Sequence, residues 1–585
     1  MRMVRAMGKK VTVDGKEIDI YGGSIHYFRV HPAQWEDRLK KLKACGFNTV
    51  ETYIAWNIHE PQKGKFEFSG ICDFEEFLRL AQKTGLYAIV RPGPYICGEW
   101  DGGGLPAWLL ADGCALRCSD ERYLSYVRDY FSVLLPKIGK HLYARGCNVI
   151  GLQIENEYGS YGNDKKYLRF LKDLYREFQM DCLWFTSDGQ CRTMLSGGTL
   201  PEVLKTVNFG SGAASAFREL DCIQPGLPRI CSEFWCGWFD WWGEPHHTRD
   251  AQSIRQEIET MIDAGAGFNL YMFCGGTNFG FMAGANYDDK YTATTTSYDY
   301  CAPLSESGDY TETYFMLRDL LREKTGVEPE PLPSAPVCQN IGRVELTQFA
   351  SLFGNLEVIG QKYNSSVPLN MEKYGQSNGY ILYRTRVNGR YDETQLSVKD
   401  VRDVAYVYID GTRAGAFSRL DYGVFSGQFG NKFLMLPEFE GEKQVDVLVE
   451  ALGRVNYGEH MPDLKGISGL YLNRQQLMGF EVYTLPLDNT EKLVYSSQPK
   501  ACPAFMKGEF SARPGEDCFV DFRGFIKGCI FINGFNLGRY WNVGPQRTLY
   551  VPGAIVKDKN EIVVFELEGY EKPEIYLTDK ARWDV

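Results

Sequence analysis

Three glutamates follow apolar stretches of the sequence and could perform acid–base chemistry. Glu155 and Glu157 end the segment 148–158, and Glu233 lies near the end of the segment 228–235. Hydrolysis of a glycosidic bond uses two carboxyl groups, one to protonate the leaving oxygen and one on the other side of the anomeric carbon. If the two groups are about 5–5.5 Å apart, the second attacks directly and the configuration is retained. Glutamates that end strands also form salt bridges or cap neighbouring elements, so residue type alone leaves both interpretations open.

The surroundings of these glutamates in the chain favour catalysis. Their neighbours are apolar or aromatic and no basic residue is adjacent, as in Ser232-Glu233-Phe234-Trp235. Burial of this kind raises the pKa of a carboxyl group, which a general acid needs. Strand alternation predicts that Glu155 and Glu157 share one face, with Asn156 on the other, so it does not choose between the two glutamates.

Polar and aromatic residues end other apolar segments in the same way. One such residue is most simply part of the core, but a set of them on one rim is typical of a sugar pocket. These residues are Tyr53, Asn57, Cys97, Glu99, Trp100, Trp238, Trp241, Trp242, Tyr271, Tyr298, Asp299 and Tyr300.

The elements that must position these side chains form a repeating pattern. A hairpin over 11–20, turning at Asp14-Gly15, comes first. Apolar segments then alternate with helical ones, as in a (β/α)8 TIM barrel spanning 1–327, an α/β fold in which active sites lie at the carboxyl ends of the strands. Strands are expected at 21–30, 48–56, 86–95, 148–158, 182–189, 206–212, 228–235 and 268–277, and helices at 32–46, 71–85, 120–142, 164–180, 250–267 and 312–326. The fifth and sixth connections have no clear helical pattern.

The rest of the chain has the pattern of an all-β structure. A Pro-rich segment over 328–336 indicates a linker. Short alternating segments follow, with turn signals at Asp410-Gly411 and Asn533-Gly534. We expect two β-sandwich, jelly-roll domains, the first over 376–490 and the second over 337–375 together with 491–585.

Composition excludes several classes of protein. The 585 residues carry a net charge of −11 with no basic run, which argues against binding to nucleic acid. No apolar stretch is long enough to span a membrane, and the first residues lack the apolar core of a secretory signal. With 17 cysteines and no CxxC, we expect reduced thiols and a cytoplasmic location. The 7 histidines include no HExxH motif, so neither a metal nor another cofactor is expected.

Longer motifs resemble those of glycoside hydrolase family 35 β-galactosidases, of the bacterial, intracellular type. The similarity covers essentially the whole chain, including INGFNLGRYWNVGPQRTLYVP (532–552), and it implies that the two β-domains are galactose-binding-like. The other segments are GGSIHYFRV (22–30), TYIAWNIHEPQKGKFEFSG (52–70), RPGPYICGEWDGGGLPAWLL (91–110), GLQIENEYGSYG (151–162), SEFWCGWFDWWGE (232–244), YMFCGGTNFG (271–280) and TSYDYCAPLSESG (296–308).

The resemblance assigns roles to individual residues. It implies that Glu157 is the acid/base, that Glu233 is the nucleophile, and that Asn156 binds the 2-hydroxyl of the sugar. It also implies that Tyr300 hydrogen-bonds Glu233 and that Trp238 packs against the sugar. Further contacts to galactose carry over to Tyr53, Cys97, Gly98, Glu99 and Tyr271, and Gly98 departs from the alanine found in many members.

The implied function is a retaining exo-β-galactosidase that releases terminal β-galactose from a galactoside oligosaccharide, without a cofactor, and a homodimer is expected. Trp241 and Tyr457 could select β1,3-linked galactose on GlcNAc or GalNAc, but Tyr457 could equally be interface packing. The alternatives are another exo-hydrolase such as a β-glucosaminidase, a carbohydrate-binding protein without activity, and a metal-dependent hydrolase. The presence of both glutamates and Asn156 argues against a binding protein, and the lack of a histidine cluster at the strand ends argues against a metal-dependent hydrolase.

Overall fold

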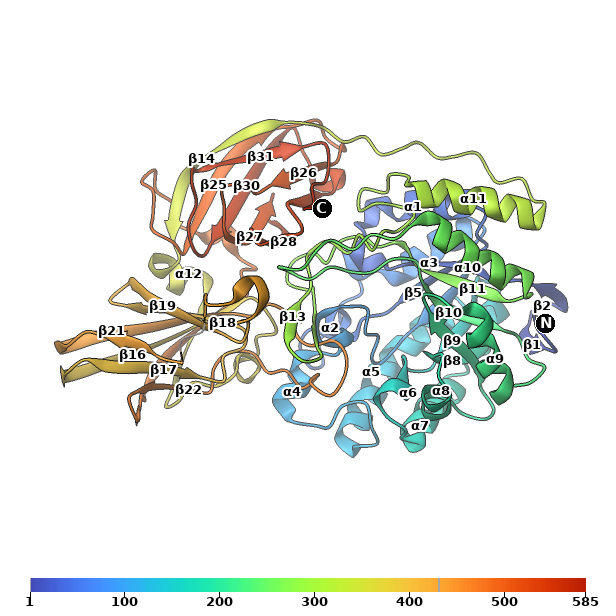
Figure 1. Ribbon diagram of the computed structural model, residues 1–585, viewed down its shortest axis with the longest axis horizontal. Coiled ribbons are helices and arrows are strands. Elements are labelled where there is room, and N and C mark those ends of the chain that lie inside the picture. The colour runs from blue at the N-terminus through green and yellow to red at the C-terminus, as the bar shows by residue number, and fades with distance from the viewer. Residues whose placement is uncertain (1, 430–431, 585) are drawn as a thin grey trace.

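A closed parallel barrel forms the first part of the molecule (Figure 1). The computed structural model describes residues 2–429 and 432–584. Each of the eight predicted barrel strands is confirmed. In chain order they are β4 (Tyr21–Ile25), β5 (Thr49–Tyr53), β6 (Tyr87–Arg91), β7 (Val149–Gln153), β8 (Leu183–Gly189), β9 (Leu204–Phe209), β10 (Ile230–Trp235) and β11 (Gly267–Cys274).

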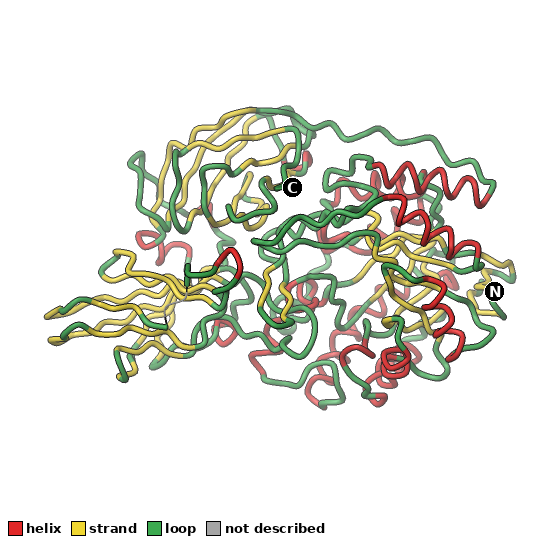
Figure 2. Tube along the Cα trace, in the orientation of Figure 1, coloured by secondary structure: helices red, strands yellow, loops and turns green. Residues whose placement is uncertain are grey.

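Helices surround this barrel on the outside (Figure 2). Their apolar faces pack against the strands, so that the barrel and its helices share one core. The six predicted helices correspond to α1 (Trp35–Ala44), α3 (Phe74–Lys83), α5 (Glu121–Gly139), α7 (Lys165–Glu177), α10 (Ala251–Asp263) and α11 (Glu312–Thr325).

The fifth and sixth connections also contain helices, although the sequence pattern did not reveal them. These are α8 (Arg192–Gly198) and α9 (Ala213–Ile223). Helix α8 is short and ends in two glycines, which are poor helix formers. Helix α9 starts after Gly212, and the Glu257 carboxylate of α10 accepts hydrogen bonds from the backbone N–H groups of Gly212 and Ala213 at 3.0 and 3.1 Å. A long-range contact therefore caps α9.

A three-stranded sheet covers the amino-terminal end of the barrel. Strands β1 (Val4–Met7), β2 (Lys10–Val13) and β3 (Lys16–Ile18) pair antiparallel. The predicted turn is confirmed, with Asp14 and Gly15 at φ 50° and 79°. Strand β1 was not predicted. Val11 and Ile20 pack here against barrel residues that include Ile89 and Ile150, and this packing closes the amino-terminal end of the barrel.

The first β-domain consists of two sheets. A six-stranded sheet has the order β15-β24-β16-β21-β18-β19, and a four-stranded sheet has the order β20-β17-β22-β23. The predicted hairpin at Asp410-Gly411 joins β18 to β19. The strands are β15 (Gln361–Ser365), β16 (Tyr380–Tyr391), β17 (Thr394–Lys399), β18 (Val404–Ile409), β19 (Thr412–Ser418), β20 (Leu434–Leu436), β21 (Phe439–Glu450), β22 (Gly469–Leu472), β23 (Gln475–Gln476) and β24 (Phe480–Leu485).

The C-terminal β-domain has eight strands in the order β28-β27-β30-β25-β14-β31-β26-β29. Strand β14 pairs with β25 over one half and with β31 over the other, so it connects the two halves of the sandwich. The turn at Asn533-Gly534 joins β27 to β28. The strands are β14 (Gly342–Ser351), β25 (Ala504–Ser511), β26 (Cys518–Asp521), β27 (Lys527–Ile532), β28 (Phe535–Trp541), β29 (Thr548–Val551), β30 (Lys559–Glu566) and β31 (Glu574–Thr578).

The segment 337–375 is divided between the two β-domains. Its β14 belongs to the C-terminal sandwich, but β15 pairs antiparallel with β24 of the first β-domain. The predicted linker 328–336 has neither helix nor strand and crosses the top of the view in Figure 1.

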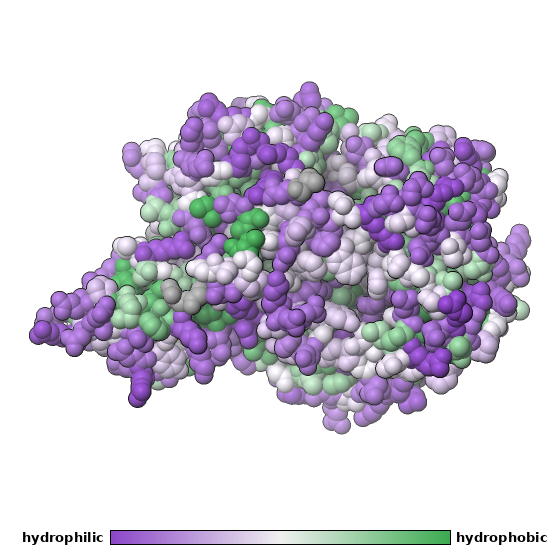
Figure 3. Space-filling view, in the orientation of Figure 1, coloured by the Kyte–Doolittle hydropathy of each residue, from purple (hydrophilic) through white to green (hydrophobic). Residues whose placement is uncertain are grey.

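A long connection after β11 brings the three parts together. It contains β12 (Ala285–Tyr287) and β13 (Tyr291–Ala293) and extends from the barrel toward both β-domains (Figure 1). Tyr291 donates to the Gly453 carbonyl at 2.7 Å, and Thr296 donates to the Arg539 carbonyl at 2.7 Å. The face in Figure 3 is largely hydrophilic, with small apolar spots on the β-domains. No helix in the described ranges is long and apolar enough to cross a bilayer.

Candidate active site

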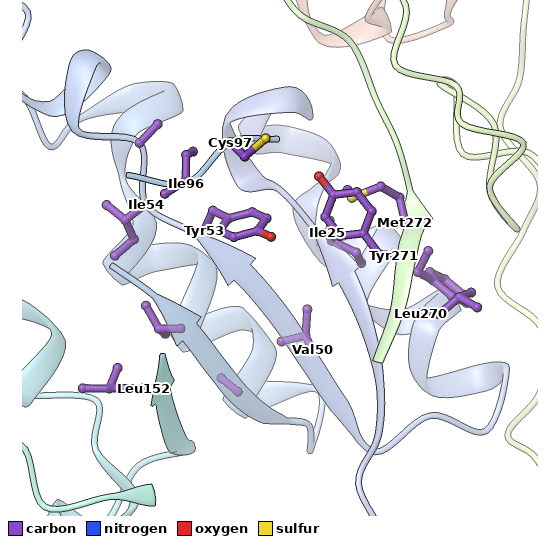
Figure 4. Packing of buried hydrophobic residues seen from close by; sticks show 14 of the residues in the cluster. Ile25, Val50, Tyr53, Ile54, Ile96, Cys97, Leu152, Leu270, Tyr271 and Met272 are labelled. Atoms are coloured by element: carbon purple, nitrogen blue, oxygen red, sulfur yellow. The ribbon is translucent and has the colours of Figure 1, made fainter. Parts of the chain in front are cut away.

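A cavity of about 340 Å³ opens where the barrel strands end. The twelve residues to which the sequence analysis gave a catalytic or sugar-binding role all line this cavity. Five members of the wider set expected at the rim do not, namely Asn57, Trp100, Trp242, Tyr298 and Asp299. Figure 4 shows three of them, Tyr53, Cys97 and Tyr271, gathered above the ends of neighbouring strands. The complete lining consists of Tyr53, Cys97, Gly98, Glu99, Asn156, Glu157, Ser160, Gly189, Met194, Glu233, Trp235, Trp238, Phe239, Trp241, Tyr271, Asn286, Asp288, Tyr300 and Tyr457.

The C-terminal domain has a larger cavity, of about 710 Å³, with different chemistry. Its buried carboxylate, Asp521, is already paired with the guanidinium groups of Arg523 and Arg582. It therefore offers no pair of free carboxyl groups for acid–base work.

The structure separates the two glutamates that follow β7. The chain leaves the strand after Gln153, and Glu155 and Glu157 both have left-handed backbone conformations, with φ 58° and 46°. The Glu155 carboxylate points to Arg117, whose Nε and Nη2 donate to it at 2.9 and 2.8 Å. Glu157 faces the cavity instead. The expectation that both share one face is wrong, because alternation ends where the strand ends.

Burial and a nearby charge set the protonation of Glu157. Its carboxyl group is removed from water, and the negative charge of Glu233 lies close by; both effects raise the pKa of Glu157 well above its ordinary value. Asn208, at the end of β9, opposes them by donating from Nδ2 to Oε1 at 3.0 Å, which favours the ionised form. The result is a carboxyl group that can hold a proton near neutral pH.

Glu233 lies in a setting that stabilises negative charge. The Tyr53 hydroxyl donates to Oε1 at 2.8 Å, and the Trp235 indole donates to Oε2 at 3.1 Å. The Arg91 guanidinium also contacts Oε1. No basic residue is adjacent to Glu233 in the chain, but Arg91 reaches it from another strand. The expected hydrogen bond between Tyr300 and Glu233 is not found among the described residues.

Arg91 organises this side of the cavity. Its Nε lies 2.9 Å from Oε2 of Glu51, and its Nη2 donates to the Ser232 carbonyl at 2.8 Å. Its Nη1 also donates to Oδ1 of Asn156 at 3.2 Å. One buried guanidinium thus connects β5, the end of β7 and β10, and fixes Glu233 relative to Asn156.

The cavity wall carries a third carboxyl group, Glu99. Cys97, Gly98 and Glu99 have successive left-handed conformations with φ 55°, 62° and 48°, which turns the Glu99 side chain into the cavity. Burial raises the pKa of Glu99 to about 7. The Tyr298 hydroxyl donates to Glu99 and lies 3.0 Å from the Tyr271 hydroxyl.

Aromatic side chains form the open rim. Trp238 is 38% exposed, and its ring lies near that of Tyr300. The Trp241 indole donates to Oδ1 of Asn286 at 2.8 Å. Tyr457 reaches the same rim from the segment after β21. Trp242 does not line the cavity and is buried in the core shared by the barrel loops and the β-domains.

Sequence reasoning missed three residues whose side chains hydrogen-bond the catalytic glutamates, namely Arg91, Asn208 and Trp235. Arg91 and Asn208 lie inside the predicted strands 86–95 and 206–212, whereas the observed strands β6 and β9 end at Arg91 and Phe209, so the predicted bounds hid their place at the strand ends. Trp235 was visible as an aromatic residue and Tyr298 was expected at the rim, but their hydrogen-bond partners were not visible. In the described ranges, no group of three or more His, Cys, Asp or Glu side chains has the arrangement of a metal site.

The barrel, the paired carboxyl groups and the aromatic rim are those of a glycoside hydrolase. The family model "Glycosyl hydrolases family 35" matches residues 10–324. Models for the first all-beta domain and the galactose-binding domain of beta-galactosidase match 368–486 and 503–561.

Relatives match over nearly the whole length. A beta-galactosidase of Xanthomonas manihotis is 41% identical, over 93% of this chain and 90% of that protein. The beta-galactosidases of Mus musculus and Homo sapiens are each 40% identical over 95% of this chain, and over 90% and 86% of their own lengths. This chain therefore belongs to glycosyl hydrolase family 35.

Proposed function

We propose that the protein is a retaining exo-β-galactosidase that releases terminal β-D-galactose from a galactoside oligosaccharide. The observation that carries the proposal is the pairing of Glu157 and Glu233 across one aromatic cavity, the first with a raised pKa and the second among three hydrogen-bond donors. The family relatives named as beta-galactosidases support the choice of galactose.

The two carboxyl groups divide the work of the first step. Glu157 gives its proton to the glycosidic oxygen while Glu233 attacks the anomeric carbon, so that the aglycone leaves as an alcohol and a galactosyl ester forms. In the second step Glu157 takes a proton from water, and the water oxygen displaces Glu233. Two inversions give β-galactose, and Glu157 ends protonated as it began.

The interaction between the two carboxyl groups supports direct attack. After burial, the charge of Glu233 raises the pKa of Glu157, as expected of two carboxyl groups in one site. An inverting enzyme needs a wider gap, of about 6.5–9.5 Å, to hold a water molecule.

The buried end of the cavity supports exo action. Glu99 and Tyr271 are almost completely buried, and together with Asn156 they present hydroxyl-binding groups to a single sugar ring. A volume of about 340 Å³ is near the lower limit of the roughly 300–1,000 Å³ common for ligand sites. One terminal galactose suits this space better than the middle of a chain.

The roles of the two glutamates can be separated with leaving groups of different basicity. Glu157→Gln should lose about 10²–10⁴-fold in kcat/KM on a disaccharide, because the leaving oxygen needs a proton. It should retain much more of the first step on β-galactosyl fluoride, because fluoride leaves without protonation. Glu233→Gln should be inactive on both. Steady-state kinetics on the two substrates measure this, and the reverse pattern would refute the assignment.

We also propose that Trp241 and Tyr457 contact the aglycone and favour β1,3-linked galactose on GlcNAc or GalNAc. Both line the open rim, which supports contact with the second sugar. Trp241→Ala and Tyr457→Ala should each lower the ratio of kcat/KM for Galβ1,3GlcNAc over Galβ1,4GlcNAc. If this ratio is unchanged in both variants, the two residues are packing only.

A further inference from the structure

The loop that carries two rim tryptophans is closed by one buried carboxylate. This loop, 236–249, follows β10 and presents Trp238 and Trp241 to the cavity. Asp240 lies between them and is only 5% exposed. Its Oδ2 lies 2.7 Å from Nδ1 of His246, and its Oδ1 accepts from the backbone N–H of His247 at 2.8 Å. The segment from Asp240 to His247 therefore forms a ring fixed at one point.

The C-terminal β-domain holds the outer side of that ring. The His246 imidazole stacks on the Trp583 indole, with ring centroids 4.4 Å apart and planes inclined by 14°. The backbone next to Trp583 pairs with 545–547, through Arg547 N–H to the Arg582 carbonyl at 2.9 Å. Gly243 N–H donates to the Gly544 carbonyl at 2.8 Å, so the domain contacts the loop at a second point.

The inner side of the ring rests on the connection after β11. Thr295 N–H donates to the Asp240 carbonyl at 3.0 Å, and Trp242 N–H donates to the Ala293 carbonyl at 3.0 Å. These backbone bonds place the main chain on both sides of Trp241. Its indole is then fixed by the hydrogen bond to Asn286. Asp240 and His246, which keep the ring closed, are thus within five positions of Trp241 in the chain but do not line the cavity.

Charge strengthens the contact between His246 and Asp240. Burial of the imidazole opposes protonation, but the hydrogen bond to Asp240 and the charges of Asp240 and Asp299 outweigh it, so the pKa of His246 is raised. His246 therefore acts as a donor to Asp240, and a charge-assisted bond of this kind is stronger than a neutral one.

We propose that Asp240, His246 and Trp583 form a clamp that positions Trp241 for the aglycone, so that the C-terminal β-domain contributes to substrate selectivity. The clamp touches neither galactose nor the reacting atoms, and its members are positioning residues. This inference rests on the proposed β-galactosidase function, which it extends from the barrel to Trp583 of the C-terminal β-domain, more than 300 residues further along the chain than Trp241.

The clamp can be tested with two substrates that differ only in the aglycone. Galβ1,3GlcNAc places a sugar at the rim, whereas β-galactosyl fluoride leaves the rim empty. Trp583→Ala removes the stacking, and His246→Phe keeps an aromatic ring on Trp583 but cannot donate to Asp240. Each should lower kcat/KM for the disaccharide about five- to tenfold, mainly through KM, because binding and not chemistry is affected. Activity on the fluoride should stay within twofold, and Trp583→Phe should restore the disaccharide.

Three other results would overturn the inference. If both variants keep wild-type kinetics on the disaccharide, the stacking has no role in selectivity. If activity on the two substrates falls equally, the contact serves general stability, and a matching fall in Tm would show this. If the wild-type protein cleaves neither substrate, the proposed function itself fails, and the clamp fails with it.

Discussion

The protonation of Glu157 depends on the few side chains around its carboxyl group. Asn208 is the neighbour that favours the ionised form by a direct hydrogen bond, because its Nδ2 donates to Oε1 at 3.0 Å. The acid must be protonated to act, so activity is lost as the pH rises through the pKa of Glu157.

Asn208→Ala should therefore raise the pKa of Glu157 and move the alkaline limb of the kcat/KM profile to higher pH. A hydrogen bond to a charged group contributes about 1.5–3 kcal/mol, so we expect a shift of about one pH unit or more. Ser187→Ala is a matched control, since the Ser187 hydroxyl bonds Oδ1 at the other end of the Asn208 amide and the Ser232 hydroxyl, each at 2.7 Å, but not the Glu157 carboxyl group. A profile that moves to lower pH in Asn208→Ala would contradict this electrostatic account.

At this scale the sequence could identify the glutamates but not their partners. Glu157 and Glu233 are visible because each ends an apolar segment, but Arg91 meets Glu233 across 142 positions of the chain. Periodicity carries no information on such pairs. The same limit left Glu155 and Glu157 indistinguishable, because the pairing of Glu155 with Arg117 is also long-range.

At the scale of the elements, close packing between the loops that follow β10 and β11 keeps the site in shape. Gly237, just after β10, leaves no room for a side chain, because a Cβ there would lie 1.7 Å from the Tyr300 carbonyl oxygen. A Cβ on Gly275, just after β11, would likewise lie 1.7 Å from the Tyr298 carbonyl oxygen. Both glycines allow the connection after β11 to pack closely, so that Tyr300 lines the cavity and the Tyr298 hydroxyl reaches Glu99.

Gly237→Ala should displace Tyr300 and reduce kcat/KM on β-galactosyl fluoride at least tenfold. It should also destabilise the fold by about 1–3 kcal/mol, as overpacking does. Gly354→Ala is the control, because the nearest atom to its added methyl would be 3.8 Å away. Kinetics and Tm for both variants decide the matter, and a fully active Gly237→Ala would show that the loops can shift without harm.

The strands of the barrel could be predicted because parallel strands buried on both faces are continuous apolar runs. Helix α9 could have been found, since Ala213, Ala216, Phe217 and Leu220 follow a helical period and are all buried. Helix α8 could not, because its seven residues include two glycines and its end packs against the chain around Gly159.

At the scale of the whole molecule, buried ion pairs join the barrel to the first β-domain. Arg454 lies on the segment that carries Tyr457 and is 1% exposed. Its Nη1 lies 3.0 Å from Oδ2 of Asp101 in the barrel, and its Nη2 contacts Glu372. The Tyr95 hydroxyl adds a hydrogen bond to the Asn456 carbonyl at 2.7 Å. The rim of the cavity is therefore built by two domains together.

Arg454→Met should destabilise the protein by about 3–5 kcal/mol, because it leaves Asp101 and Glu372 buried without their partner. It should also raise KM for disaccharides by loosening Tyr457. Arg386→Met is the matched control, since its pair with Glu442 is exposed and contributes about 0–1 kcal/mol. Thermal and urea unfolding of both variants measure the difference, and equal stability would mean that the interface is not held by this pair.

The division of the chain into a barrel and two β-sandwiches could be predicted from the change of pattern near residue 327. The division of 337–375 between the two sandwiches could not be predicted. Nothing in the sequence of β15 shows that it pairs with β24 and not with a strand of the C-terminal sandwich. The cytoplasmic location and the homodimer stay predictions.

The central claim is the retaining release of galactose by Glu157 and Glu233. Proton NMR during hydrolysis of Galβ1,3GlcNAc and Galβ1,4GlcNAc tests it most directly, because the anomer released first is seen before mutarotation. We predict β-galactose first, with faster release from the β1,3 isomer. Equal rates for the two isomers would remove the selectivity from the account but leave the mechanism. Release of α-galactose first would contradict retention, and no galactose from either would contradict the function.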